Sequence, residues 1–261
     1  MDEGNVCFFL GFIALVVVLM IVGWHQRQAR QSAMRHLAME LGWSFDHGDA
    51  RIGGDGLLST LLGLEGGGGG QYHAFAIFNR GSDRRAYNTL QGVLNLPGAG
   101  GAAACPAIAG DFRYTTGSGK NRSTSHFSYL VVRLPVGPVP ELIVRPEGFF
   151  DQVASFVGYD DIDFESAEFS DAFHVKGSDK RFAWDLCDAR MMQFLLETRP
   201  DMFELEGHYL CVSAGRGRWR PEDFHARIAW TQRFVAQWPR HLVDSLAPRE
   251  SHAASTWGAQ P

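Results

Sequence analysis

Three carboxylates, Asp161, Asp163 and Glu165, alternate along an acidic stretch of the sequence. If this stretch is extended, the three carboxylates lie on one face, and Ile162 and Phe164 lie on the other. Oxygen ligands grouped in this way could hold a divalent cation and support a metal-dependent hydrolase. The alternative is an ordinary solvated strand face whose carboxylates pair with some of the chain's arginines. The spacing alone leaves both interpretations open, and we expect the solvated face.

A second group of charges lies in the stretch NRGSDRRAY at 79–87, which is predicted to be a turn between two strands. Arg80, Arg84 and Arg85 could together bind a phosphate or a lipid head group, because guanidinium groups donate paired hydrogen bonds to such anions. The alternative is a solvated turn whose arginines are paired with neighbouring acids.

The other motifs that carry chemistry are missing from the sequence. The ten histidines have no HExxH or HxH spacing, and no GxSxG turn is present. The glycine-rich stretches 63–70 and 97–106 do not match a phosphate-binding loop and are predicted to be flexible loops. Cys105, Cys187 and Cys211 form no CxxC pair and are predicted to be buried as small apolar side chains. We therefore expect no catalytic residue, no bound metal and no cofactor.

These candidate residues must be positioned by a domain over residues 43–243. Alternating apolar residues predict strands at 72–78, 88–94, 111–116, 123–134, 142–144, 173–175, 203–206 and 208–213. Helical spacing and capping residues predict helices at 149–157, 178–197 and 222–238. Because strands and helices do not alternate regularly, we expect an α+β fold, a single domain of mainly antiparallel sheet with three or four packed helices. Within the 178–197 helix, Phe182, Leu186 and Phe194 should be buried.

The strongest feature of the sequence is an uncharged apolar segment at residues 6–24. As a helix it would be about 28 Å long, close to the hydrocarbon thickness of a bilayer. A juxtamembrane helix is predicted at 25–42, and the ends of the chain, residues 1–5 and 244–261, are predicted to be an extracytoplasmic N-terminus and a disordered tail. The segment lacks the basic start and the small-residue cleavage site of a signal peptide.

Charges flanking the apolar segment predict its orientation. Asp2 and Glu3 precede it, and Arg27, Arg30 and Arg35 follow it. By the positive-inside rule, the N-terminus is outside and the C-terminal domain is cytoplasmic at the cell membrane. A net charge of −5 argues against nucleic-acid binding. The expected partners are the lipid bilayer, through residues 6–24, and a protein that the sequence does not identify.

Four stretches carry a family resemblance: LIVRPEG at 142–148, the segment from Asp161 to Leu196, the juxtamembrane stretch from Arg35 to Phe45, and the turn at 79–92. Together they resemble a family of bacterial single-pass membrane proteins with a cytoplasmic domain of unknown function. This resemblance implies a membrane anchor but no activity and no catalytic residues. The sequence as a whole predicts a non-enzymatic, membrane-anchored module that binds a protein or a lipid. The alternative is a membrane-bound metal-dependent hydrolase that uses the carboxylates at 161–165.

Overall fold

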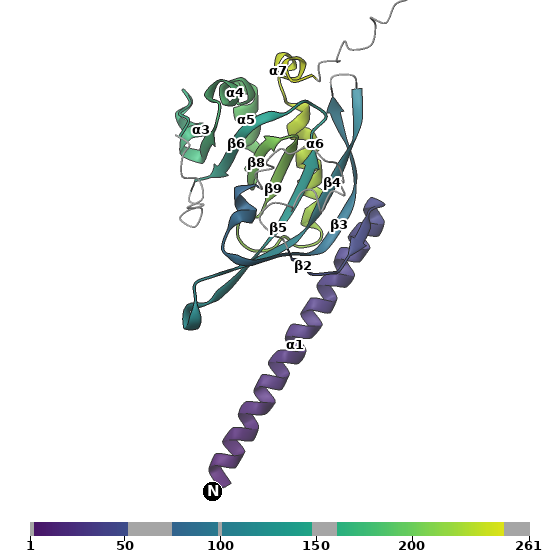
Figure 1. The fold of residues 1–261 in the computed structure, drawn as a ribbon, viewed down its shortest axis with the longest axis vertical. Coiled ribbons are helices and arrows are strands. Elements are labelled where there is room, and N and C mark those ends of the chain that lie inside the picture. The colour runs from purple at the N-terminus through teal and green to yellow at the C-terminus, as the bar shows by residue number, and fades with distance from the viewer. Residues whose placement is uncertain (1–2, 52–74, 99–100, 148–160, 248–261) are drawn as a thin grey trace, which may run out of the picture.

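The structure, a computed structural model, describes residues 3–51, 75–98, 101–147 and 161–247. One long helix leads from the N-terminus to a twisted sheet that is covered by shorter helices (Figure 1). Every pair of named strands is antiparallel. The expected α+β class, with an N-terminal apolar helix before a mainly antiparallel sheet, is therefore confirmed.

Helix α1 (Glu3–Leu41) is continuous over 39 residues. At 1.5 Å per residue it is about 58 Å long, whereas the hydrocarbon core of a bilayer is about 30 Å thick. The predicted segments 6–24 and 25–42 are therefore successive parts of one helix. Among the described residues, α1 is the one helix that is long and apolar enough to span a membrane.

The C-terminal end of α1 is packed into the domain core. Met34, Leu37 and Ala38 are buried there, together with Trp43 just after the helix. The indole of Trp43 lies directly over Gly92, where an added Cβ would be 2.2 Å from the ring. Glycine is therefore required at this position, and the close contact fixes α1 against the sheet.

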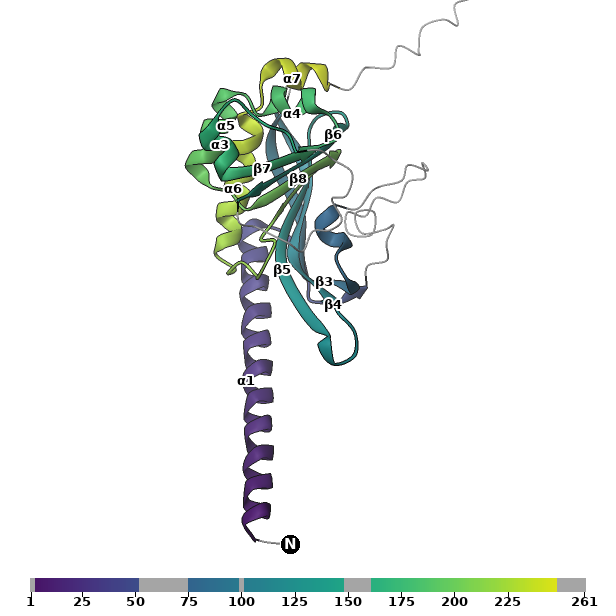
Figure 2. The same cartoon turned by 90° about the vertical axis from the view of Figure 1, so that its left-hand side faces the viewer.

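The sheet has nine strands in the order β1-β3-β4-β5-β9-β8-β6-β7, with β2 also pairing to β3. The strands are β1 (Ser44–Asp46), β2 (Ala50–Arg51), β3 (Ser82–Gly98), β4 (Gly101–Thr116), β5 (Ser123–Arg133), β6 (Val139–Pro146), β7 (Phe173–Gly177), β8 (Met202–Gly207) and β9 (Tyr209–Ser213). The long β4–β5 hairpin projects from the domain toward the N-terminal half of α1 (Figures 1 and 2).

Helices cover the two faces of this sheet unequally. On one face lie the end of α1 and the helices α3 (Ala167–Ala172), α4 (Lys180–Leu186), α5 (Ala189–Thr198), α6 (Asp223–Ala236) and α7 (Arg240–Ser245) (Figure 2). The other face carries the short helix η1 (Ala76–Asn79), whose Phe78 packs among the rings of Phe112, Phe127 and Tyr129. The sheet therefore separates two apolar clusters.

Several predicted elements are wrong. Residues 76–79 form η1 rather than a strand, because the amides of Ala76 and Ile77 donate to the buried carboxylate of Glu204 instead of to a neighbouring strand. The predicted turn at 79–87 is shorter, since β3 begins at Ser82. Residues 101–106, predicted to be a loop, belong to β4 because the β3–β4 ladder continues to the pair Gly98–Gly101.

The helix predicted at 178–197 is two helices, α4 and α5. The helix breaks at Cys187, and Asp188 then caps α5 by accepting from the amide of Met191. Phe182, Leu186 and Phe194 are nevertheless buried, as predicted. Helix α7 was not predicted, and it extends the folded chain to Ser245.

Three further expectations depend on residues that the structure leaves undescribed. The loop at 63–70, the helix at 149–157 and most of the 244–261 tail lie outside the described residues.

Cys105, Cys187 and Cys211 are buried free thiols, which confirms their predicted role as small buried side chains.

Candidate functional site

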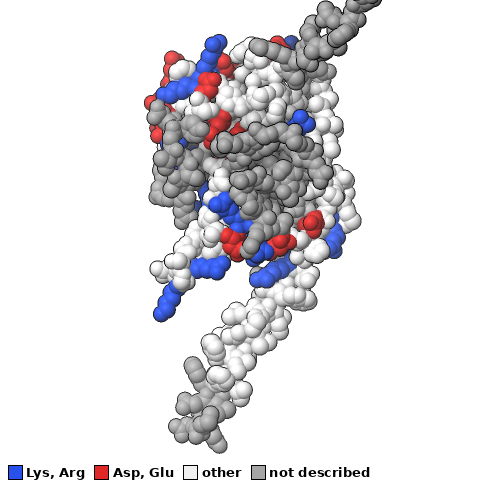
Figure 3. Space-filling view, in the orientation of Figure 1, with Lys and Arg blue, Asp and Glu red and all other residues white. Residues whose placement is uncertain are grey.

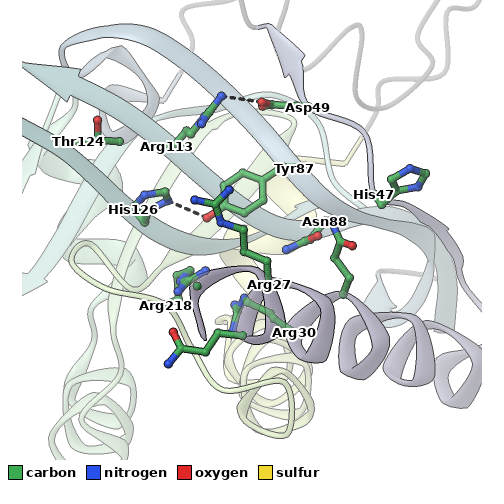
Figure 4. Close-up of a pocket in the computed structure, with 13 residues that line it drawn as sticks. Arg27, Arg30, His47, Asp49, Tyr87, Asn88, Arg113, Thr124, His126 and Arg218 are labelled. Carbon is green, nitrogen blue, oxygen red and sulfur yellow. Dashed lines mark hydrogen bonds and ion pairs between the residues drawn. The ribbon is translucent and has the colours of Figure 1, made fainter. Parts of the chain in front are cut away.

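A pocket of about 630 Å³ lies between the middle of α1 and parts of β3, β4 and β5 (Figure 4). Its walls come from α1 (Gly23, Gln26, Arg27, Arg30, Gln31), the loop after β1 (His47, Asp49), the strands (Tyr87, Asn88, Arg113, Thr124, His126) and the loop after β9 (Arg218). The pocket is thus assembled from segments that are far apart in the sequence. We call it the juxtamembrane pocket.

The pocket floor is an ion pair that joins the helix to the sheet. The guanidinium of Arg30 donates from Nε to Asp111 Oδ2 at 2.7 Å and from Nη2 to Oδ1 at 2.6 Å. Asp111 is fully buried and also accepts from Asn88 Nδ2 and Ser128 Oγ. A third bond runs from Arg30 Nη1 to the carbonyl of Trp219. With its charge neutralised by Asp111, Arg30 serves mainly to hold α1 in place.

Strand β3 is bent at this point so that Asn88 can reach Asp111. Asn88 adopts a left-handed conformation with φ of 51°, beside an irregularity in the β3–β4 pairing between Tyr87 and Leu90. An asparagine tolerates this conformation better than most residues, and its buried amide gains a charge-assisted hydrogen bond in return.

A hydrogen-bonded chain of side chains forms one wall. The Tyr87 hydroxyl lies 2.7 Å from Nδ1 of His126, and the Arg218 side chain is hydrogen-bonded to Tyr87. Burial raises the pKa of Tyr87 to about 12, so its hydroxyl keeps its proton. Burial, followed by the charges of Arg218 and Arg113, lowers the pKa of His126, which favours the neutral imidazole.

The pocket carries more positive than negative charge. Arg27 and Arg218 are exposed at its rim, and Arg27 has no ion-pair partner among the described residues. Asp49 is the single carboxylate among the lining residues, and it is already 2.6 Å from Arg113 and 3.6 Å from Arg85. Basic side chains, with acidic ones among them, lie along the edge of the domain from which α1 emerges (Figure 3). The arrangement suits an anion.

The acidic segment lies on another part of the molecule, at the β7 edge of the sheet. Asp161, Asp163 and Glu165 are exposed, whereas Ile162 is buried and Phe164 packs against the core. The predicted division between two faces is therefore present.

The three carboxylates nevertheless do not converge. Asp161 is paired with Lys176 at 3.3 Å. The backbone carbonyl of Asp163 accepts a hydrogen bond from the indole N–H of Trp184. In the described part of the chain, no group of three or more histidines, cysteines or carboxylates could hold a metal ion.

The arginines of the predicted turn also point to different places. Arg80 is only 6% exposed, and its Nη1 donates to the carbonyl of Gly215 inside the domain. Arg84 is half-buried and donates from Nε to the carbonyl of Gly81 in its own turn, whereas Arg85 is paired with Asp49. The structure therefore does not bring these three arginines together around one anion. The basic pocket instead uses arginines from α1, β4 and the loop after β9.

The sequence contained two signals for this site. Arg27 and Arg30 were used only to orient the apolar segment, although their spacing of three places both on one side of a helix. Asp111 is a charged residue inside an apolar strand pattern, and such a residue needs a buried partner. No local pattern connected Asp111 to Arg30, because 81 residues separate them.

No protein-family model and no curated protein matches this chain. Among solved structures, it is similar to the crystal structure of the mycobacterial trehalose monomycolate transport factor A, TtfA. The TM-score is 0.48 and the sequence identity is 14%, over 84% of this chain and 97% of that one. A likeness at this level carries no argument about ligand or activity.

Proposed function

We propose that the protein is a non-enzymatic, membrane-anchored binding module, and that the juxtamembrane pocket holds a phosphate-bearing ligand at the cytoplasmic surface of the bilayer. The observation that carries this proposal is the convergence of Arg27 and Arg218 on a pocket whose single carboxylate, Asp49, is already paired with Arg113. Guanidinium groups bind phosphate with paired, charge-assisted hydrogen bonds.

The height of the pocket on α1 supports a ligand at the membrane surface. Gly23 and Arg27 line the pocket, and the side chain of Trp24, the residue after Gly23, is exposed. Tryptophan is enriched at the boundary between hydrocarbon and head groups. The pocket would therefore lie at head-group level, where the cytoplasmic leaflet presents anionic phosphates.

The same geometry favours binding over catalysis. Asp49 is paired with two arginines, Tyr87 keeps its proton, and Asp111 is neutralised by Arg30. His126 therefore lacks a neighbouring carboxylate that could orient it as a general base. The rim arginines, Arg27 and Arg218, supply hydrogen-bond donors and no base. This constellation binds an anion without activating a nucleophile.

The test uses the full chain in nanodiscs. We expect glycerol 3-phosphate, or phosphatidylglycerol in place of phosphatidylcholine, to raise the melting temperature, because a ligand that binds only the folded state stabilises it. The double variant Arg27→Gln/Arg218→Gln should lose this response. The matched control Arg181→Gln, which changes an exposed arginine on α4, should keep it. If neither anion stabilises the wild-type protein, the proposal is wrong.

A cytoplasmic location for residues 25–261 is a separate part of the proposal. A reporter enzyme that is active only outside the membrane, fused after Pro261, should be silent, and a reporter that works only in the cytoplasm should be active. The reverse result would place the pocket on the opposite leaflet.

A further inference from the structure

We infer that the ligand of the juxtamembrane pocket is an anionic phospholipid that enters sideways from the bilayer past Gly23, with one acyl chain lying along α1 at Val16–Met20. This inference rests on the proposed function and adds the source of the ligand and its path. It requires the pocket to be open toward the hydrocarbon as well as toward water.

A second hollow on α1 provides this opening. It is lined by Val16, Leu19 and Met20 and, nearer the domain, by Gly23, Trp24 and Arg27. Gly23 and Arg27 also line the juxtamembrane pocket, so the two hollows adjoin at these residues. The combined surface is apolar at one end and basic at the other. Its polarity therefore matches an amphiphile with an anionic head.

Gly23 forms the passage between the two hollows. A Cβ added at this position would have no heavy atom within 4 Å, so the space beside it is empty rather than filled by a neighbouring side chain. A glycine at this position leaves the boundary between the two hollows uncovered by a side chain.

The charges at the domain end of the passage complete the match. Arg27 extends from α1 toward Tyr87 and His126, and Arg218 approaches the same wall from the opposite loop (Figure 4). A phosphate between them would be about one helical turn above Gly23, since four residues separate Gly23 from Arg27. A phospholipid can place its phosphate at this level while its acyl chain stays in hydrocarbon. A soluble phosphate would make no use of the apolar hollow.

The experiment fills the apolar hollow without touching the juxtamembrane pocket. Val16→Trp places a large side chain in the apolar hollow, and Val17→Trp is the matched control, because Val17 is an exposed valine on the same helix that lines neither hollow. Each full-length variant is reconstituted in nanodiscs of phosphatidylcholine with phosphatidylglycerol. Native mass spectrometry then measures the ratio of the two lipids retained by the protein. Stabilisation by glycerol 3-phosphate is measured in discs of phosphatidylcholine alone.

We expect wild type and Val17→Trp to retain phosphatidylglycerol above its proportion in the disc, and Val16→Trp to retain it only at that proportion. Stabilisation by glycerol 3-phosphate should be the same for all three proteins, because neither valine lines the juxtamembrane pocket. Equal enrichment in Val16→Trp and wild type, or no enrichment in wild type, would overturn the inference. If glycerol 3-phosphate then still stabilised wild type but not Arg27→Gln/Arg218→Gln, the proposed function would stand and the ligand would be a soluble anion.

Discussion

The acidic segment and the juxtamembrane pocket contain charges of opposite sign, and the fold treats them differently. Asp161, Asp163 and Glu165 are neighbours in sequence but lie exposed, with Asp161 paired to Lys176. The pocket gathers residues from 23 to 218 into one concave surface. The spacing of the 161–165 carboxylates is recognisable in the sequence, but these side chains do not converge on one ligand. The site with convergent charges is built by tertiary contacts.

The two regions also differ in how they are held together. The pocket floor is a buried, hydrogen-bonded ion pair, whereas the region around the acidic segment is held by apolar side chains such as Ile162, Phe169 and Leu186. Four substitutions test this difference.

Arg30→Met should have the largest effect, because it leaves the carboxylate of Asp111 buried without its cation. Removing one partner of a buried pair typically costs about 3–5 kcal/mol. Denaturant unfolding of the full chain in detergent should show this loss, and Asp111→Asn in the same chain should recover part of it. The control Arg27→Met, one helical turn away and exposed, should cost less than about 0.5 kcal/mol. Equal losses for the two arginine variants would contradict the structural role of Arg30.

Leu186→Ala tests the apolar end of the molecule. Leu186 is fully buried, and deleting a buried leucine side chain typically costs about 2–5 kcal/mol. Trp184, two residues earlier and 54% exposed, provides the control: Trp184→Ala should cost less than about 1 kcal/mol. A loss below about 0.5 kcal/mol for Leu186→Ala would mean that α4 packs through another face.

Glu204 gives a pH-dependent effect on the far side of the sheet from α1. Burial raises its pKa from 4.5 to about 8, despite the opposing hydrogen bonds from the amides of Ala76 and Ile77. Between these values the unfolded chain binds fewer protons than the folded one, so stability should fall as the pH rises from about 4.5 to about 8. Glu204→Gln should flatten this part of the melting-temperature profile. An unchanged slope would mean that Glu204 is ionised in the folded protein.

Asp163→Asn should have the smallest effect. Because the 161–165 carboxylates are exposed and do not converge, millimolar Mg²⁺, Mn²⁺ or Ca²⁺ should leave the melting temperature of wild type and variant nearly unchanged. A rise of several degrees in wild type that is abolished in the variant would instead support the metal-dependent hydrolase.

Local patterns in the sequence were sufficient for much of the fold. The β8–β9 hairpin turns at Gly207 as predicted, because alternation and a glycine at φ of 55° specify it locally. The predictions for 76–79 and 101–106 were wrong where a distant partner decides the conformation: Glu204 for the first, and the ladder to β3 for the second.

The site was less predictable than the fold for the same reason. Composition and flanking charges identified the apolar segment and the arginines after it, including Arg27 and Arg30. They could not show that Arg30 turns inward to Asp111 while Arg27, three residues earlier, stays at the rim. This difference depends on how the sheet docks against α1, and no local pattern encodes the docking.

The continuity of α1 has a mechanical consequence. Because the same unbroken helix passes through the apolar segment and is then pinned by Arg30 and Trp43, the domain has no swivel between itself and its anchor. A change in tilt of about 10°, well within the range of transmembrane helices, would move the end of a rod about 58 Å long by about 10 Å. Bilayer thickness affects the tilt of a membrane-spanning helix. Because α1 is rigidly joined to the sheet, a change in this tilt would change the height and direction of the sheet above the lipid.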